Sequence, residues 1–359
     1  MRSIRISIIC ITFILLMLGL ITVYSSSAIY ASESLGDSMF FLKRHLLFLG
    51  IGFAVSLAAL ACSMDFLREH SRVIMYATLG LLVLVFVPGF GKMAGGARRW
   101  IDFWMFNVQP SEMAKITLVL YLADYISRRE SRMENLLYGY APPLFVIGLT
   151  MGLVILQPDL GTAVSIGFIG LFMLFIGGAR VRHIVTTVLL SVPVVYYLIS
   201  SSSYRKRRIL AFIDPWLDER GTGFQIVQSF IALGSGGFLG VGLGQSRQKL
   251  FFLPASHTDF VFSIIGEELG FLGTVCVLVL FFALIWQGAR AAFKIEDTFR
   301  KMFIFGIVFT IAFEVIINVG VATGVLPTKG LPLPFISYGG TSLVVHMAAI
   351  SLILNVMRD

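Results

Sequence analysis

Ten long apolar segments follow one another along this chain of 359 residues, and they constrain its fold more than any other feature. They lie near residues 6–25, 45–63, 72–90, 111–127, 138–156, 160–178, 181–199, 262–287, 302–324 and 340–357. A helix needs about 20 residues to cross a hydrocarbon core about 30 Å thick, and each segment is close to that length. The apolar runs are continuous and do not alternate with polar residues. They therefore predict membrane-spanning helices and exclude a transmembrane barrel.

The composition agrees with this prediction, because the chain is 57% hydrophobic and only 13% charged. The formal net charge of +8 would suit nucleic acid in a soluble protein, but the basic residues are spread over loops on both sides of the membrane. We expect no nucleic-acid partner. Cys10, Cys62 and Cys276 all lie in apolar runs and are expected to be small core residues. We therefore predict an all-α polytopic integral membrane protein with one transmembrane domain over residues 1–359.

The distribution of Lys and Arg predicts the orientation of the spans. With the N-terminus in the cytoplasm, the termini and short inner loops carry 14 positive residues and the short outer loops carry 6. Both termini are therefore predicted to be cytoplasmic, although the first run also resembles a signal peptide with small residues at 26–28. The irregular segments 91–110, 157–159, 200–261 and 325–339 then face outward. We expect the active site on this outer face, with 200–261 as one long extracytoplasmic loop.

Ionisable residues at the ends of the spans or inside them are candidate functional groups. A charge buried in hydrocarbon costs roughly 2.5–3.5 kcal/mol even on the most lenient scale. Glu112 and Lys115 follow Pro110 and are three residues apart, so they share one face at the start of a helix. They form either a self-neutralising ion pair or part of the wall of an outer cavity. Arg98 and Arg99 either bind phosphate or extend their charges to the membrane interface.

Two aspartates stand at predicted span starts near the outer face. Asp159 follows Pro158, and a helix N-cap accounts for its position, while a catalytic or metal-binding role remains an alternative. Asp259 precedes the eighth span. Burial at an apolar boundary raises the pKa of a carboxyl group into the range of a general base. The alternative is a carboxylate at a helix start, with His257 and Thr258 as its neighbours.

The long outer segment combines a basic run at 205–208 with glycines between 234 and 244. Glycine permits close backbone approach, and with the neighbouring Arg247 and Lys249 it suits an anionic group such as a diphosphate. The alternative is a flexible re-entrant loop. The segment 330–342 contains two prolines and paired glycines around Ser337. We expect its backbone to be broken and to line a cavity.

Three further carboxylates lie deeper in the predicted spans. Glu267 and Glu268 follow Asp259 by about 12–14 Å at 1.5 Å per residue. Buried pairing with another helix and a proton path in a transporter are both open roles for them. Glu314 is four residues from Asn318, and we expect hydrogen bonds between helices there. The sequence contains no P-loop, dinucleotide fingerprint or His-Glu-x-x-His zinc motif, so ATP-driven and zinc-protease functions are not favoured.

Taken in order, these motifs resemble the SEDS family (shape, elongation, division and sporulation proteins), of the FtsW and RodA type. The resemblance covers essentially the whole chain. Its motifs are Gly96 to Ile101, Gln109 to Glu112 with Lys115, Gln157 to Thr162, Gln225 to Gly244, His257 to Phe260, Gly266 to Gly270, and Leu331 to Gly340. The stretch from 242 to 249 is more similar to the division and sporulation branch than to the elongation branch.

The resemblance implies a SEDS fold of ten spans and the activity of a peptidoglycan glycosyltransferase. Such a protein polymerises lipid II on the outer face of the bacterial plasma membrane, beside a class B penicillin-binding protein and other division-complex membrane proteins at the septum. The family's proposed catalytic aspartate falls on Asp259, and its charged pair falls on Glu112 and Lys115. The family often has Pro-Glu before the His-Thr-Asp block, where this chain has Pro-Ala-Ser at 254–256. Any role of that glutamate is therefore in doubt here.

The implied mechanism is an inverting transfer. Asp259 would take the proton from the 4-hydroxyl of an acceptor GlcNAc, whose oxygen attacks the anomeric carbon of a MurNAc carried on undecaprenyl diphosphate. Arg98, Arg99, Arg247 or Lys249 would neutralise the leaving diphosphate, with a divalent cation (Mg²⁺ or Mn²⁺) as a further candidate and no organic cofactor. The alternatives are a lipid II flippase, an elongation polymerase of the RodA type, and a scaffold that only recruits the penicillin-binding partner.

Overall fold

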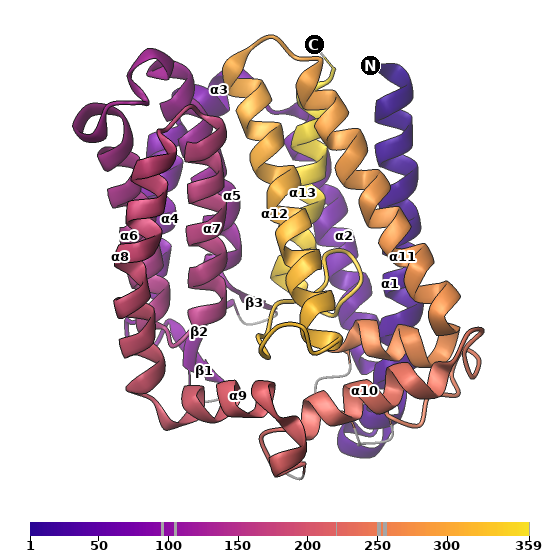
Figure 1. Ribbon diagram of the computed structural model, residues 1–359. Coiled ribbons are helices and arrows are strands. Elements are labelled where there is room, and N and C mark those ends of the chain that lie inside the picture. Colours follow the sequence, from indigo (N-terminus) through magenta and orange to yellow (C-terminus); the bar gives the residue numbers. More distant parts are fainter. Residues whose placement is uncertain (95–96, 104–105, 220, 250–252, 254–256, 359) are drawn as a thin grey trace.

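The computed structural model describes residues 1–359 except 95–96, 104–105, 220, 250–252, 254–256 and 359. Within the described residues, the long helices stand side by side in one bundle (Figure 1). They are α1 (Arg2–Leu35), α2 (Phe40–Ala61), α4 (Ser71–Leu84), α5 (Pro110–Arg128), α6 (Ala141–Leu156), α7 (Leu160–Ile176), α8 (Val181–Ser200), α11 (Val261–Phe293), α12 (Thr298–Ala322) and α13 (Gly340–Val356). Each helix corresponds to one predicted span.

Length and apolar composition support a membrane location for most of these helices. In the described part of the chain, six helical stretches are long and apolar enough to cross a membrane, including α6 with the π-helical turn η2 (Leu136–Tyr140) before it. Three shorter apolar helices are α4, α7 and α13. Helix α5 occupies the remaining predicted span. The count of ten crossings stays a prediction.

Both termini lie at the same end of the bundle, as Figure 1 shows. This agrees with the predicted placement of the two termini on one side of the membrane. Short helices α3 (Met64–Glu69) and η1 (Glu130–Arg132) connect spans at that end. The opposite end carries the segments that the positive charges predict to face outward, and we call it the outer end.

The predicted helical fold is incomplete at the outer end, because it did not include a small sheet. Residues 91–108 form a small antiparallel sheet of β1 (Gly91–Ala94), β2 (Ala97–Phe103) and β3 (Phe106–Val108), in that order. Lys92 pairs with Trp100, and Ile101 pairs with Val108. Strands of three to seven residues between two long spans leave little hydrophobic pattern, so the sequence did not reveal them.

The prediction of one long loop over 200–261 also needs correction. That segment contains α9 (Ser203–Ile213), the short 3-10 helix η3 (Pro215–Asp218) and α10 (Phe224–Gly236). Figure 1 shows α9 and α10 lying across the outer end of the bundle. Helix α10 buries Ile226, Val227 and Ser229 along one face. This amphipathic pattern belongs to a helix that rests on the bundle and not to a free loop.

The helices begin where local chemistry favours a start. Pro110 occupies the first turn of α5, where a missing amide hydrogen has no cost. The Asp159 carboxylate accepts a hydrogen bond from the Thr162 amide at the start of α7, and the Asp297 carboxylate accepts one from the Arg300 amide at the start of α12. These caps fix the N-terminal starts of α7 and α12, and the start of α7 forms part of the outer site.

Burial is uneven among the helices. Helices α5 and α12 bury most of their length and pack against each other and against α7 and α13. Helix α8 lies at the edge, and His183 is its only buried residue. Its exposed side chains are mostly apolar, as expected for a helix that faces lipid instead of water.

Candidate active site

The backbone around Asp259 is held by α12 and by the segment before α13. The Asn318 side-chain amide donates one hydrogen bond to the Asp259 carbonyl (3.0 Å) and another to the Leu331 carbonyl (2.9 Å). The residue was expected to bond between helices. It bonds instead to two irregular segments that meet above α12. Asn318 therefore fixes the start of α11 relative to residues 325–339.

Ser337 reinforces the same junction. Its hydroxyl donates to the Thr258 carbonyl (2.5 Å) and accepts from the Leu333 amide (2.8 Å). The Tyr338 amide donates to the His257 carbonyl (2.9 Å). The segment 331–338 thus binds the His-Thr-Asp backbone through the Ser337 hydroxyl and the Tyr338 amide. Ser337, a candidate site residue, positions this backbone.

The His257 ring is packed among aromatic side chains from α1, α2 and the segment before α13. Its centroid lies 4.7 Å from that of Phe41, 5.8 Å from Tyr338 and 6.2 Å from Tyr30. Burial lowers the pKa of His257 to about 4, so the ring is neutral near pH 7. The neutral imidazole packs against these three rings at the site.

Asp259 is half-buried, and part of the residue is open to solvent. Burial raises its pKa to about 6, and the negative charge of Asp159 adds to the rise. The guanidinium groups of Arg208 and Arg99 and a hydrogen bond from Thr258 oppose this rise. Asp259 is therefore ionised near neutral pH while it keeps an appreciable affinity for a proton.

Gly330 has no side chain, and this leaves room for the Asp259 carboxylate. A β-carbon at Gly330 would lie 3.1 Å from Asp259 Oδ2, which is tighter than ordinary contact. A side chain at this position would press against the carboxylate or cover it. The glycine in this segment therefore keeps one side of Asp259 open.

Asp159 and Arg99 build the neighbouring wall. Asp159 accepts hydrogen bonds from the Thr162 amide (3.1 Å) and hydroxyl (3.0 Å), which confirms its predicted role as a helix cap. Arg99, on β2, places its Nε 3.9 Å from Asp159 Oδ2. It also donates to the carbonyls of Gln157 (3.2 Å) and Pro158 (2.5 Å). Arg99 thus holds the turn before α7 and brings a positive charge to the site.

Two cations at this site were not among the residues selected from the sequence. Arg208 of α9 donates to the Thr328 carbonyl (3.3 Å) and lies over the Tyr204 ring, 4.5 Å from its centroid. The side chain of Lys329 reaches the start of α7, where a β-carbon on Gly161 would lie 3.7 Å from it. Burial lowers the pKa of Lys329. The basic run at 205–208 was a visible signal, but it could not show which of its four residues faces inward.

The outer end thus gathers charges from five separate segments. Asp159 and Asp259 supply two negative charges, and Arg99, Arg208 and Lys329 supply three positive ones. We call these five residues the outer cluster. An excess of cations around a half-buried carboxylate suits an anionic ligand, such as a phosphate or diphosphate, that brings a hydroxyl group to the base.

The other predicted diphosphate ligands have different surroundings. Arg98 is exposed on β2 beside Arg99, and Arg247 is exposed in the segment after α10. Lys249 is buried, and its Nζ lies 3.0 Å from Glu268 Oε1. Because Glu268 neutralises Lys249 inside the protein, the prediction that Lys249 binds a diphosphate is not supported. The partner was missed because it lies 19 residues away in the sequence.

Glu267 and Glu268 have structural partners of their own. The Ser25 hydroxyl of α1 donates to both oxygens of Glu268 (2.6 and 2.8 Å). Glu267 accepts hydrogen bonds from the Arg247 amide (2.8 Å) and from the Ser246 hydroxyl. The prediction of buried pairing is confirmed, since Glu268 joins α11 to α1 while Glu267 holds the segment after α10.

A second charged cluster lies inside the bundle. Lys115 Nζ is 2.9 Å from both carboxylate oxygens of Glu112, and it also bonds to Glu314. His346 Nε2 lies 2.7 Å from Glu314 Oε2. All four side chains are buried. The predicted Glu112–Lys115 ion pair is therefore confirmed. Its place is a closed junction of α5, α12 and α13, and Glu314 bonds between helices as expected.

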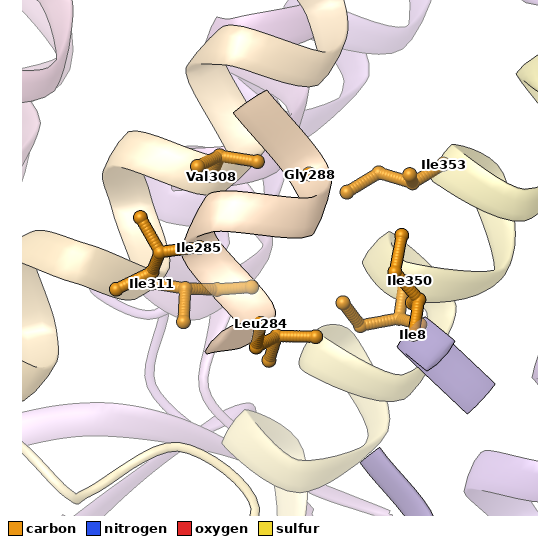
Figure 2. Close-up of a pocket in the computed structure, with 8 residues that line it drawn as sticks. All are labelled: Ile8, Leu284, Ile285, Gly288, Val308, Ile311, Ile350 and Ile353. Atoms are coloured by element: carbon orange, nitrogen blue, oxygen red, sulfur yellow. The ribbon is translucent and has the colours of Figure 1, made fainter. Parts of the chain in front are cut away.

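Two hollows lie toward the end that carries the termini. Figure 2 shows an apolar pocket of about 10 Å³ between α1, α11, α12 and α13, lined by Ile8, Leu284, Val308, Ile350 and their neighbours. A larger hollow of about 240 Å³ lies where α5 ends and α12 begins. Neither is lined by a member of the outer cluster. The outer cluster is the candidate active site because it combines a carboxyl group of raised pKa with three cations.

Comparison with known proteins agrees with this geometry. A family model described as a cell cycle protein, which covers FtsW, RodA and SpoVE, matches residues 6–359. The chain belongs to the FtsW/RodA/SpoVE family. It is 43% identical over 338 residues to the probable peptidoglycan glycosyltransferase FtsW of Geobacter metallireducens, covering 94% of this chain and 90% of that relative. It is 41% identical over 351 residues to the stage V sporulation protein E of Bacillus subtilis, covering 98% and 96%.

Solved structures of this family show the same fold. One belongs to a structure described as "Structural coordination of polymerization and crosslinking by a peptidoglycan synthase complex". The chain matches it with a TM-score of 0.81 and 32% identity, over 98% of this chain and 97% of that chain. It matches the rod shape determining protein RodA of Thermus thermophilus with a TM-score of 0.73 and 28% identity, over 98% and 96%. The predicted SEDS fold is confirmed.

Four of the segments that carried the resemblance to this family meet at the outer cluster. The turn at 157–159 supplies Asp159, and the block at 257–260 supplies Asp259, whose backbone is held by the segment 331–340. Strand β2 supplies Arg99. The Pro-Ala-Ser departure at 254–256 and Gly96 lie outside the described residues. Motifs spread between residues 97 and 340 therefore form one site at the outer end.

Proposed function

We propose that this chain is a peptidoglycan glycosyltransferase that polymerises lipid II, with Asp259 as the general base. One observation carries the proposal. A half-buried carboxyl group with a pKa of about 6 stands among three cations at the outer end of a membrane bundle. The chain also shares its fold with a chain of a peptidoglycan synthase complex and is 43% identical to a relative named peptidoglycan glycosyltransferase.

The chemistry needs one base. Asp259 accepts the proton of the 4-hydroxyl of an acceptor GlcNAc as that oxygen forms a bond to the anomeric carbon of the donor MurNAc. The bond from that carbon to undecaprenyl diphosphate breaks, and the diphosphate leaves with the electron pair. Attack from the face opposite the leaving group inverts the configuration and gives a β-1,4 linkage. A carboxylate that titrates near pH 6 is ionised at pH 7 and still binds the proton well.

The leaving diphosphate needs positive charge. Arg99, Arg208 and Lys329 converge on the outer cluster from β2, α9 and the segment before α13, and their charges exceed those of the two aspartates. Cations held in place before the reaction stabilise the charge that develops on the leaving group. Exposed Arg98 and Arg247 remain predictions as further contacts to the diphosphate.

The divalent cation expected from the resemblance remains a prediction. Both oxygens of Asp159 already accept hydrogen bonds from Thr162. Within the described ranges, no group of three or more His, Cys, Asp or Glu side chains is arranged to hold a metal ion. No step of the mechanism is assigned to a metal.

The same comparisons support a proposed partner and location. A class B penicillin-binding protein that cross-links the new glycan is the proposed partner, since a structural neighbour belongs to a complex described as coordinating polymerisation and crosslinking. The relatives named FtsW and SpoVE favour the division and sporulation branch over the elongation branch. We therefore place the protein in the plasma membrane at the division septum, with other division proteins.

The test is polymerisation of lipid II by the purified protein in liposomes. The Asp259→Asn variant should make glycan about 10²–10⁴-fold more slowly, because loss of a general base has this effect. Asp102→Asn is the matched control, because Asp102 is an exposed aspartate of the outer sheet paired with Lys92. Normal polymerisation by Asp259→Asn would refute the proposal. Movement of lipid II across the bilayer without polymer would identify a flippase, and partner recruitment without either activity would identify a scaffold.

A further inference from the structure

Helix α11 is broken close to its outer end. Gly270 has φ 69° and ψ −165°, far from helical values. A break of this kind leaves carbonyl groups before it and amides after it without helical partners. Residues 237–243, which we call the glycine loop, supply the missing partners. The bonds are Val241 N to Glu267 O (3.0 Å), Gly242 N to Glu268 O (3.0 Å), Phe271 N to Gly237 O (2.9 Å) and Leu272 N to Phe238 O (3.2 Å).

Only glycine permits this contact between two backbones. A β-carbon on Gly240 would lie 2.2 Å from the Glu268 carbonyl oxygen, and one on Gly270 would lie 2.3 Å from the Gly240 nitrogen. Both residues also have positive φ, at 82° and 69°. The glycine cluster that suggested a diphosphate loop therefore has another purpose, which is to bring the loop against the broken helix.

The side chains of the glycine loop point the other way. Leu239 is 74% exposed, Phe238 is 63% exposed and Leu243 is 58% exposed. The Phe238 ring stacks at 5.9 Å on the exposed ring of Phe271, just past the break. Between 236 and 244 the sequence contains only glycine and large apolar residues. A loop with a paired backbone and a bare apolar surface is unlike a loop built to face water.

The position of the break places this surface at the membrane boundary. The 23 residues of α11 after Gly270 span about 34 Å at 1.5 Å per residue, close to the thickness of a hydrocarbon core of about 30 Å. The far end of this stretch carries Arg290 and Lys294. Exposed apolar residues such as Val279 and Phe282 continue along α11. Irregular backbone at membrane depth requires protein partners for its polar groups, and the glycine loop and α11 satisfy each other.

We propose that the glycine loop, together with Phe271, is inserted into the outer leaflet and contacts lipid acyl chains. The inserted loop fixes the broken end of α11 at the membrane surface. Ser246 and Lys249 follow it and bind Glu267 and Glu268, so the anchor is joined to the start of α11. Asp259 stands two residues before that start. The loop thus sets the height of the outer cluster above the lipid.

The test uses a nitroxide spin label at position 239 of the full-length protein in liposomes. The native thiols Cys10, Cys62 and Cys276 are first replaced by alanine, and Leu239→Cys supplies the single attachment point. Power saturation then compares collisions with oxygen, which concentrates in the bilayer, and with a water-soluble nickel chelate. Val279→Cys on α11 serves as the lipid reference, and Glu219→Cys, an exposed charged position after η3, serves as the water reference.

The expected ratio of oxygen to nickel collisions at position 239 is several-fold higher than at 219 and close to that at 279. A ratio equal to that at 219 would place the loop in water and overturn the proposal. Low collision rates with both reagents would also overturn it, because they would mean that protein and not lipid covers the loop. Leu239 is largely exposed, so its label does not disturb the core.

Discussion

The raised pKa of Asp259 leads to a specific pH dependence. A general base acts only when ionised, so the rate of glycan synthesis should rise as the pH increases through the pKa of about 6. At pH 5 about one molecule in ten carries the ionised carboxylate, so the rate should be about tenfold below the plateau. An aspartate at its ordinary pKa of about 3.9 would instead be almost fully ionised at pH 5 and would show almost no decrease there.

Arg208 supplies the perturbation that connects this pH profile to the structure. Its guanidinium group is the strongest of the charges that stabilise the ionised form of Asp259. Removing that charge in Arg208→Gln should raise the pKa of Asp259 further, so the acidic limb moves to higher pH. Arg207→Gln is the matched control, because Arg207 is the preceding residue on α9 and is exposed. Its profile should overlay that of the parent protein.

The assay is the initial rate of lipid II polymerisation at subsaturating substrate, between about pH 4.5 and 8.5, because kcat/KM reports the free protein. The midpoint of the limb is compared, and not the absolute rate, because Arg208 also serves the leaving group in the proposed mechanism. A flat profile down to pH 5 would refute the argument that burial raises the pKa of the base. An unchanged midpoint in Arg208→Gln would show that this guanidinium does not act on Asp259.

Two further predictions concern stability, measured as unfolding of the purified protein in detergent. Lys115→Met leaves Glu112 and Glu314 buried without their shared cation, and it should destabilise the fold by about 3–5 kcal/mol, whereas Lys92→Met removes an exposed pair worth at most about 1 kcal/mol. Equal effects of the two changes would contradict the buried cluster. Gly240→Ala drives a β-carbon into the Glu268 carbonyl at positive φ and should cost more than about 2 kcal/mol, while Gly80→Ala on α4 meets no atom within 4 Å and should be neutral or slightly stabilising. A tolerated Gly240→Ala would contradict the backbone pairing at the helix break.

Local chemistry accounts for what could be predicted from the sequence. The apolar runs predicted the ten helices of the bundle, and Pro110 and Asp159 marked helix starts that the structure confirms. Glu112 and Lys115 are three residues apart, so their pairing follows from helical geometry alone. The helix starts and this ion pair depend on residues within one turn of each other, and the apolar runs are continuous segments. Sequence spacing therefore determines them.

The remaining features depend on contacts between distant segments. Glu314 and His346 reach Lys115 from two other helices, and Glu268 reaches Lys249 across the break in α11. Which residue of the run 205–208 faces the bundle depends on how α9 lies over it. Residue spacing does not reveal this orientation. The same limit applies to the glycine cluster. Its composition suited a phosphate loop, and only the partner backbone of α11 shows that it supports a helix break.

The two charged clusters differ in a way that separates structure from chemistry. In the inner cluster, Lys115 lies between Glu112 and Glu314, His346 approaches the second of these, and all four side chains are sealed from solvent. Adding a ligand or a proton there would disrupt ion pairs in which these charged groups already neutralise one another. In the outer cluster, cations outnumber carboxylates and Asp259 is partly open to solvent. A charge imbalance that remains open to solvent suits an anionic substrate, so of the two clusters the outer one is suited to the proposed binding of a diphosphate and to proton exchange.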